Sequence, residues 1–107
     1  MINKLPINDI LIRIQAVAKE NGVNLTYVGM KVYLKLLEYA EDEMSGAQEE
    51  PKGVRFYLTT HAFARYCSVS PRTVTDTLRK LKQCGIIKYT VQTPGPSVIV
   101  LYNDFYQ

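Results

Sequence analysis

The sequence predicts a single α+β domain that spans its 107 residues. Three observations support this prediction. Apolar residues recur at helical spacing in four separate segments, and two short segments near the C-terminus are rich in β-branched residues. Hydrophobic residues make up 47% of the chain, yet no run approaches the roughly 20 apolar residues of a membrane span. The composition therefore indicates a soluble domain with one modest core.

The strongest helical signal lies at 70–84. Ser70 can accept a hydrogen bond from an unpaired amide of the first turn, and Pro71 suits the first helical position. Val74, Leu78 and Leu81 then fall on one narrow arc of the helix. The pattern predicts a capped helix that buries a single apolar stripe.

The opposite side of this helix is polar and basic. Because an α-helix turns by about 100° per residue, residues away from the apolar stripe should face solvent. They are Arg72, Thr73, Thr75, Asp76, Arg79, Lys80, Lys82 and Gln83. Each of them alone is compatible with an ordinary solvated helix face, and only the set as a whole indicates a binding surface.

A β-hairpin is predicted directly after this helix. Gly85 should end the helix in a left-handed conformation, and strands are expected over 86–91 and 97–102. The loop between these strands is rich in Pro and Gly and contains neither Lys nor Arg. Upstream, a strand over 54–58 should pair with the hairpin, and a short Thr-capped helix should end at Cys67.

The N-terminal half is predicted to contain two helices and a loop. The first helix covers 7–22, with Asn8 or Asp9 as its cap, and the second runs from a Thr26 cap to about residue 40. The apolar stripe of the first helix comprises Ile7, Ile10, Leu11, Ile14, Val17 and Ala18. The segment 41–53 has five acidic residues and no apolar period, so we expect a mobile acidic loop there.

The order of helix, tight turn, capped basic helix, glycine and hairpin resembles the winged helix-turn-helix family of DNA-binding domains. The residues that carry the resemblance are Leu58, Thr59, Thr60, Phe63, Ala64, Cys67, Ser68, Val69, Ser70, Thr73, Val74, Leu78, Leu81, Gly85, Ile86 and Ile87. The likeness is greatest to bacterial repressors and to the N-terminal domains of phage and plasmid replication proteins. It implies three core helices, an accessory N-terminal helix within 1–22, and a helix-turn-helix and wing over 54–102.

The charge of the chain is distributed unevenly. Residues 1–50 contain five Lys or Arg against eight Asp or Glu, whereas residues 51–107 contain eight Lys or Arg against two Asp. The net charges of the two halves are therefore −3 and +6. A basic half that contains the proposed reading helix is the distribution expected of a protein that binds phosphate groups.

Individual residues can be given roles in DNA binding. Arg72 can bind guanine through two hydrogen bonds, Thr75 can contact a thymine methyl group, and Asp76 can accept from cytosine or hold Arg72. Arg79 and Lys82 suit phosphate contacts. With the N-terminus of the preceding helix as a second phosphate site, the predicted contact residues are Thr59, Thr60, His61, Ser70, Arg72, Thr73, Thr75, Asp76, Arg79, Lys82 and Lys88.

The sequence gives no support for an enzyme. It has no nucleophile elbow, no Gly-rich phosphate loop and no metal-ligand spacing, so we expect no cofactor, metal or small-molecule ligand. Cys67 and Cys84 are expected to be small buried hydrophobic residues in a reducing compartment. Because no signal peptide is evident, a cytoplasmic location is the expectation.

The functional hypothesis is therefore sequence-specific binding of double-stranded DNA by a transcriptional regulator, with the protein acting as a homodimer. Two alternatives stay open. One is a replication or maintenance factor of a phage or plasmid, and the other is a winged-helix module that binds a protein without binding DNA. Ile12 lies off the first apolar stripe, and either a dimer contact or simple exposure would account for it.

Overall fold

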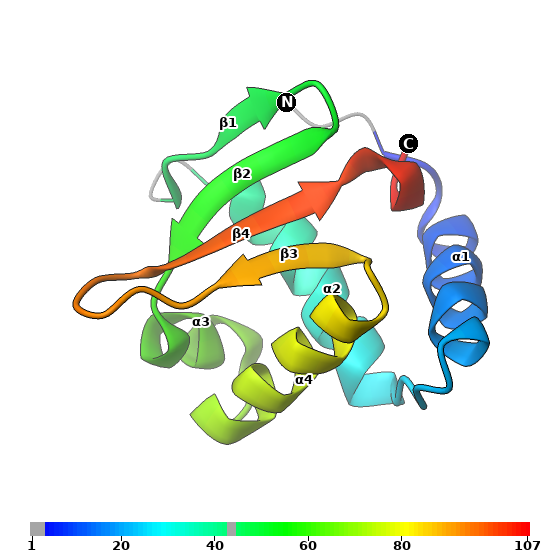
Figure 1. Ribbon diagram of the computed structural model, residues 1–107, viewed down its shortest axis with the longest axis horizontal. Coiled ribbons are helices and arrows are strands. Elements are labelled where there is room, and N and C mark those ends of the chain that lie inside the picture. Colours follow the sequence, from blue (N-terminus) through cyan, green and yellow to red (C-terminus); the bar gives the residue numbers. More distant parts are fainter. Residues whose placement is uncertain (1–3, 43–44) are drawn as a thin grey trace.

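The structure is a computed structural model that describes residues 4–42 and 45–107 (Figure 1). The described residues form an α+β fold of four α-helices, four strands and a short 3-10 helix. The elements are α1 (Ile7–Glu20), α2 (Tyr27–Ala40), β1 (Gln48–Glu50), β2 (Gly53–Leu58), α3 (Thr60–Cys67), α4 (Pro71–Gln83), β3 (Ile87–Thr90), β4 (Ser97–Tyr102) and η2 (Asn103–Phe105).

The strands form one antiparallel sheet in the order β1-β2-β4-β3. Phe56 of β2 pairs with Ile99 of β4, which in turn pairs with Tyr89 of β3, and all three side chains are buried. The pairing confirms the predicted hairpin and the predicted strand over 54–58. The first hairpin strand is one residue shorter at each end than the predicted 86–91, since it begins at Ile87 and ends at Thr90, before the exposed Val91.

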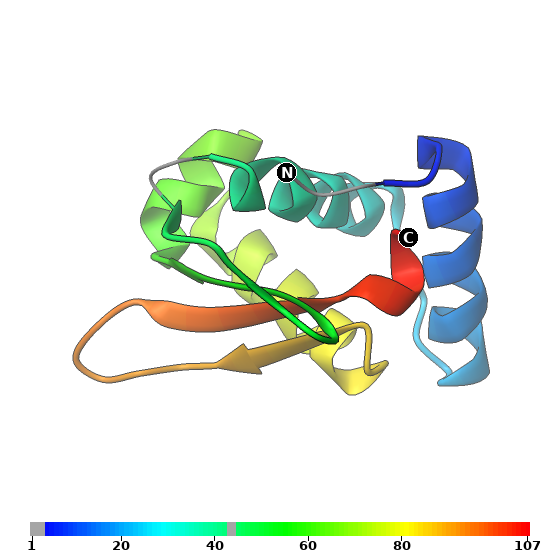
Figure 2. The ribbon, with the colours of Figure 1, turned by 90° about the horizontal axis from the view of Figure 1, so that it is seen from above.

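Three helices cover one face of this sheet. α2 packs on α3, α4 and β2, while α4 packs on β3, and Figure 2 shows α2 and α3 on the same side of the strands. The core between the two layers is apolar and closely packed. Its largest fully buried side chains include Tyr33, Leu36, Leu37, Phe56, Leu58, Phe63, Leu78, Leu81, Ile86 and Ile87.

Helix α1 stands at one end of the molecule, beside η2 (Figures 1 and 2). The prediction of Asn8 or Asp9 as its cap is wrong: the cap is Pro6, and the helix already includes Ile7. Pro6 has no side-chain hydrogen bond to offer, but its carbonyl accepts from the amides of Asp9 and Ile10 at 3.0 and 3.2 Å. Its fixed φ also starts the helix earlier than the polar residues suggest.

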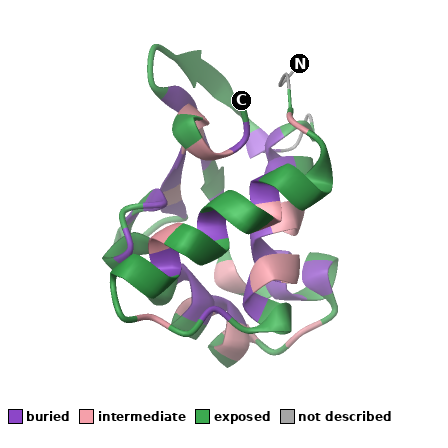
Figure 3. Ribbon diagram, turned by 90° about the vertical axis from the view of Figure 1, so that its right-hand side faces the viewer, coloured by how far each residue is buried: buried purple, intermediate pink, exposed green. Residues whose placement is uncertain are grey.

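The buried stripe of α1 is narrower than predicted. Ile10, Ile14 and Ala18 are buried and Leu11 and Val17 are half-buried, whereas Ile7 is 60% exposed. Ile12, which the sequence places off the stripe, is 64% exposed. Figure 3 shows that much of the outward side of this helix is exposed. Because α1 packs on the body along only one narrow face, its first residue and its outer side remain in contact with solvent.

The segment 41–53 is not entirely a loop, contrary to the prediction. Gln48–Glu50 form β1, which pairs with Gly53–Arg55 of β2. All three β1 residues are exposed, so the strand carries no apolar alternation that the sequence could reveal. Backbone pairing with the edge of β2 is sufficient to order it. Residues 43–44 of the predicted loop lie outside the described residues.

Two glycines are placed where the backbone requires them. Gly85 has φ +75°, which confirms the left-handed end of α4. A side chain at Gly53 would clash with the main-chain carbonyl of Leu101 on β4, so glycine is needed where these strands meet.

In the part of the chain that the structure describes, no helix has the length and apolar character needed to cross a membrane.

Candidate nucleic-acid interface

The start of α4 is organised by its first residues. Ser70 accepts a hydrogen bond from the amide of Thr73 at 3.1 Å, and the hydroxyl oxygens of the two residues are 2.9 Å apart. Pro71 occupies the first helical position. The predicted cap is therefore confirmed, and it fixes where the polar side of α4 begins.

One side of α4 is buried and the other faces solvent. The predicted stripe of Val74, Leu78 and Leu81 is completely buried, and Thr77 is buried beside it. Thr77 was not predicted to be buried, because a hydroxyl at the edge of an apolar arc gives no periodic signal. The rest of the helix is left to present its charged residues outward.

Arg72 and Asp76 lie on the exposed side, one turn apart. The side chain of Arg72 is 92% exposed and that of Asp76 is 55% exposed. Arg72 Nε is 4.0 Å from Asp76 Oδ2. Arg79, Lys80 and Lys82 are exposed further along the helix, so cations outnumber the single acidic residue of α4. Lys80 was not among the predicted contact residues, but its exposure adds to the same positive surface.

The hydroxyl hydrogen of Thr75 is already used within α4, whereas the predicted contact with a thymine methyl group does not depend on it. This hydroxyl donates a hydrogen bond of 3.1 Å to the carbonyl oxygen of Pro71, and the residue is half-buried. A threonine inside a helix often bonds back to the carbonyl four residues earlier. This bond uses the only donor of Thr75, so for contact with a base the residue keeps its methyl group and the acceptor lone pairs of its hydroxyl.

The N-terminus of α3 provides a second polar group of residues. Thr59 occupies the cap position but its side chain makes no capping hydrogen bond, and its carbonyl accepts from the amide of Phe63 at 3.0 Å. Thr59 and His61 are exposed, and Thr60 is half-buried. The chain then turns through Ser68, which has φ +58°, into the Ser70 cap of α4.

The turn places α3 directly against α4. Figures 1 and 2 show α3 and the β3–β4 loop on the same side of the molecule, away from α1. Figure 1 shows α4 running from the α3 side toward the middle of the molecule, so its first turns lie at the same end of the fold as α3. The unpaired amides at the start of a helix favour an anionic partner there.

Lys88 does not join this group. It alternates along β3 with the buried Ile87 and Tyr89, so it projects from the face of the sheet that the helices do not cover. Residues 91–96 of the following loop are exposed and contain no cation. The sequence could not separate Lys88 from the α4 residues, because a positive charge does not show on which side of a sheet it lies.

The two cysteines are not reactive groups. Cys67 and Cys84 are both buried and free. Burial raises the pKa of the Cys67 thiol to about 11, although the nearby charge of Lys35 lowers it. Burial also raises the pKa of Cys84. Both thiols are thus poor nucleophiles at neutral pH, as expected of packed side chains.

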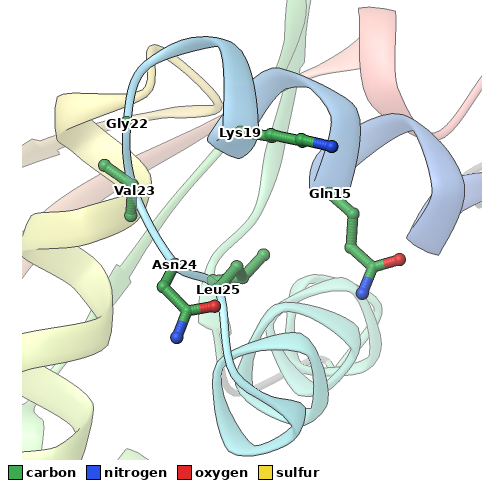
Figure 4. Close-up of a pocket in the computed structure, with 6 residues that line it drawn as sticks. All are labelled: Gln15, Lys19, Gly22, Val23, Asn24 and Leu25. Atoms are coloured by element: carbon green, nitrogen blue, oxygen red, sulfur yellow. The ribbon is translucent and has the colours of Figure 1, made fainter.

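A separate cleft of about 570 Å³ lies between the end of α1 and the start of α2 (Figure 4). It is lined by Gln15, Lys19, Gly22, Val23, Asn24 and Leu25. Lys19 is the one charged residue among these, and no α3 or α4 residue lines the cleft. No sequence pattern indicates this cleft, because its lining comes from α1 and the segment that connects α1 to α2.

The chain matches no model of a known protein family, and no curated protein sequence matches it.

Proposed function

We propose that this protein is a winged helix-turn-helix protein that binds double-stranded DNA in a sequence-specific manner and regulates transcription. The observation that carries the proposal is the exposed face of α4, which combines a well-formed cap with the exposed cations Arg72, Arg79 and Lys82. This helix follows α3 after a tight turn and precedes a β-hairpin. That is the element order of the resembled family.

The dimensions of duplex DNA support this use of α4. An α-helix is about 10–12 Å across with its side chains, and the major groove of B-DNA is about 12 Å wide. The first turns of α4 would then face the base edges. Arg79 and Lys82, which lie one to three turns later, would meet phosphate groups and position the helix.

The start of α3 supports a second phosphate contact. Its exposed residues Thr59 and His61 lie beside unpaired backbone amides, which attract anions. The start of α3 and the exposed side of α4 would thus contact the phosphate backbone of the DNA from two separate helices. The acidic residues of β1 lie on the edge strand opposite β3, the strand on which α4 packs.

The proposal includes a homodimer. The exposed Ile12 on α1 suits a contact between two copies, because a large apolar side chain gains from burial. A two-fold dimer would place two α4 helices about 34 Å apart, and the preferred DNA site would be palindromic. Sedimentation velocity of the protein and of Ile12→Glu tests this, and a wild type that stays monomeric at micromolar concentration would contradict it.

The first test of DNA binding is fluorescence anisotropy with a library of random duplexes across a salt series. We expect log affinity to fall linearly with log salt, with a slope that corresponds to several phosphates. Arg79→Ala should make the slope shallower by about 1. Lys19→Ala, which removes the same charge from α1, is the matched control and should leave the slope unchanged. Absence of binding at low salt would overturn the proposal.

One observation favours a second candidate, a module that binds another protein. The β3–β4 loop, residues 91–96, is exposed and carries no cation, and its Val91 side chain is 64% exposed. Such a loop suits an uncharged protein surface better than a phosphate backbone. Failure of the anisotropy test for both wild type and Arg79→Ala would favour this candidate.

A further inference from the structure

The hydrogen bonds within α4 limit which of its side chains can read a base. Thr75 has used its only donor on the carbonyl oxygen of Pro71. Ser70 and Thr73 share a hydrogen bond of 2.9 Å and also form the helix cap. Their contact uses one of the two hydroxyl hydrogens, so the pair keeps at most one donor for a base.

Arg72 is not limited in this way. Its side chain is 92% exposed, and Asp76 is the only ion-pair partner that it has among residues 4–42 and 45–107. The contact involves Nε, at 4.0 Å from Asp76 Oδ2. The two terminal nitrogens, Nη1 and Nη2, therefore remain available for a ligand.

The free end of this guanidinium has the chemistry of a guanine reader. Two parallel N–H donors match the O6 and N7 acceptors that guanine presents in the major groove. Asp76 can only accept hydrogen bonds, so it repels the acceptor edges of guanine and thymine and tolerates the amino group of cytosine. The two residues thus favour the two bases of one pair.

We propose that Arg72 and Asp76 act together as the specificity determinant of α4 and select a G·C base pair. This inference depends on the proposed DNA binding. Arg72 binds the guanine through Nη1 and Nη2. Asp76 is a positioning residue, since its carboxylate lies 4.0 Å from Nε and attracts the guanidinium by charge without a hydrogen bond. The hydroxyl of Thr75 takes no part in the selection.

The test begins with selection of bound sequences from the random duplex library by the wild-type protein. Affinities are then measured for the selected site and for single base-pair changes within it. We expect one G·C pair whose replacement weakens wild-type binding on the order of tenfold to a hundredfold. Arg72→Lys keeps the positive charge but has no planar pair of donors, so it should bind random duplexes normally and lose most of this preference.

Asp76 is tested by two variants. Asp76→Ala should strengthen binding to random duplexes, because a negative charge near phosphate is removed, and should nevertheless reduce the preference for the G·C pair. Asp76→Glu keeps the carboxylate charge that attracts Nε and should restore part of the preference. Glu20→Ala, which removes an exposed acidic residue from α1, is the matched control and should change neither quantity.

Thr75→Val completes the design, because it removes the hydroxyl and retains a methyl group at nearly constant shape. It should leave the G·C preference unchanged. The inference is overturned if the preference survives Arg72→Lys, if Asp76→Ala strengthens all duplexes equally, or if Thr75→Val abolishes the preference. In each of these cases the wild type still binds DNA and the proposed function stands. A wild type that binds no duplex overturns both.

Discussion

Arg13 on α1 is hydrogen-bonded to the main chain of Asp104, which follows it by 91 residues. Its Nη1 donates to the carbonyl oxygens of Asp104 and Gln107, both at 2.9 Å. The amide of Leu5 donates to the carbonyl of Tyr106 at 2.7 Å in the same region. Helix α1 is therefore attached to the body through the C-terminal residues as well as through its apolar stripe.

Arg13→Ala should weaken this attachment. We expect the free energy of unfolding to fall by about 1 kcal/mol, since two charge-assisted hydrogen bonds are lost at an exposed site where water competes for them. Urea denaturation followed by circular dichroism measures the change. Lys19→Ala on the same helix has no such bonds to lose and should stay close to wild type, and equal losses in the two variants would contradict the interpretation.

Ser70→Ala should destabilise the protein by about 1 kcal/mol, because the capping bond to the amide of Thr73 disappears. Thr59→Ala is a suitable control, since Thr59 occupies the cap position of α3 without a side-chain capping bond. Thr59→Ala should lower the free energy of unfolding by less than Ser70→Ala does. The two values come from thermal or urea unfolding, and the reverse order would mean that the Ser70 bond contributes little.

Tyr33→Phe should leave stability unchanged or raise it by up to about 1 kcal/mol. The Tyr33 side chain is completely buried, and among the described residues its hydroxyl has no hydrogen-bond partner. Burial without a partner also raises the pKa of this phenol. Removing such a group avoids its desolvation cost. A clear loss of stability in urea denaturation would indicate that the hydroxyl is bonded in solution, for example to an internal water.

Stability should decrease at alkaline pH. The pKa of the Cys67 thiol is about 11 in the folded protein and 9.0 in the reference state, so the unfolded chain loses this proton first. The stabilising contribution is complete below about pH 9 and is lost as the pH rises toward 11, at up to about 1.4 kcal/mol per pH unit. Cys84 acts in the same direction, because burial raises its pKa as well.

This pH dependence can be assigned with Cys67→Ala. The variant should be less stable overall, because a buried side chain is truncated, but its stability should fall less steeply between pH 9 and pH 10. Urea denaturation at several pH values gives both quantities. An unchanged slope would place the titration on other groups.

Lys82→Ala and Lys88→Ala should differ in their effect on DNA binding. Lys82 lies on the exposed side of α4, whereas Lys88 projects from the uncovered face of the sheet. Lys82→Ala should make the salt dependence shallower by about 1, and Lys88→Ala should leave it nearly unchanged. A larger effect of Lys88→Ala in the anisotropy series would place the DNA on the sheet instead of on α4.

The parts of the fold that the sequence predicted well depend on local signals. The cap at Ser70, the stripe from Val74 to Leu81 and the left-handed Gly85 all lie within one short segment, and each follows from the preferences of its own residues. The hairpin strands were equally clear, because β-branched residues flank a Pro- and Gly-rich loop.

The parts that could not be predicted depend on distant partners. Strand β1 exists because the edge of β2 is available, and its own three residues are all exposed. The side-chain conformation of Thr75, which bonds to Pro71, is likewise not encoded in a sequence pattern. The direction of Lys88 depends on which face of the sheet the helices cover. Periodicity and element order in the sequence therefore predict the candidate site, whereas the structure shows that Lys88 lies apart from it and that the Thr75 hydroxyl hydrogen is already bonded.

The hydrogen bond between Leu5 and Tyr106 joins the segment before α1 to the segment after η2, and this proximity makes the domain suitable for circular permutation. A short linker could connect these two segments, and new termini could be opened at Gly95 in the exposed β3–β4 loop. Such a permutant would keep α3 and α4 continuous while the hairpin loop is cut. Its remaining affinity for DNA would measure what the covalent loop contributes, independently of any substitution.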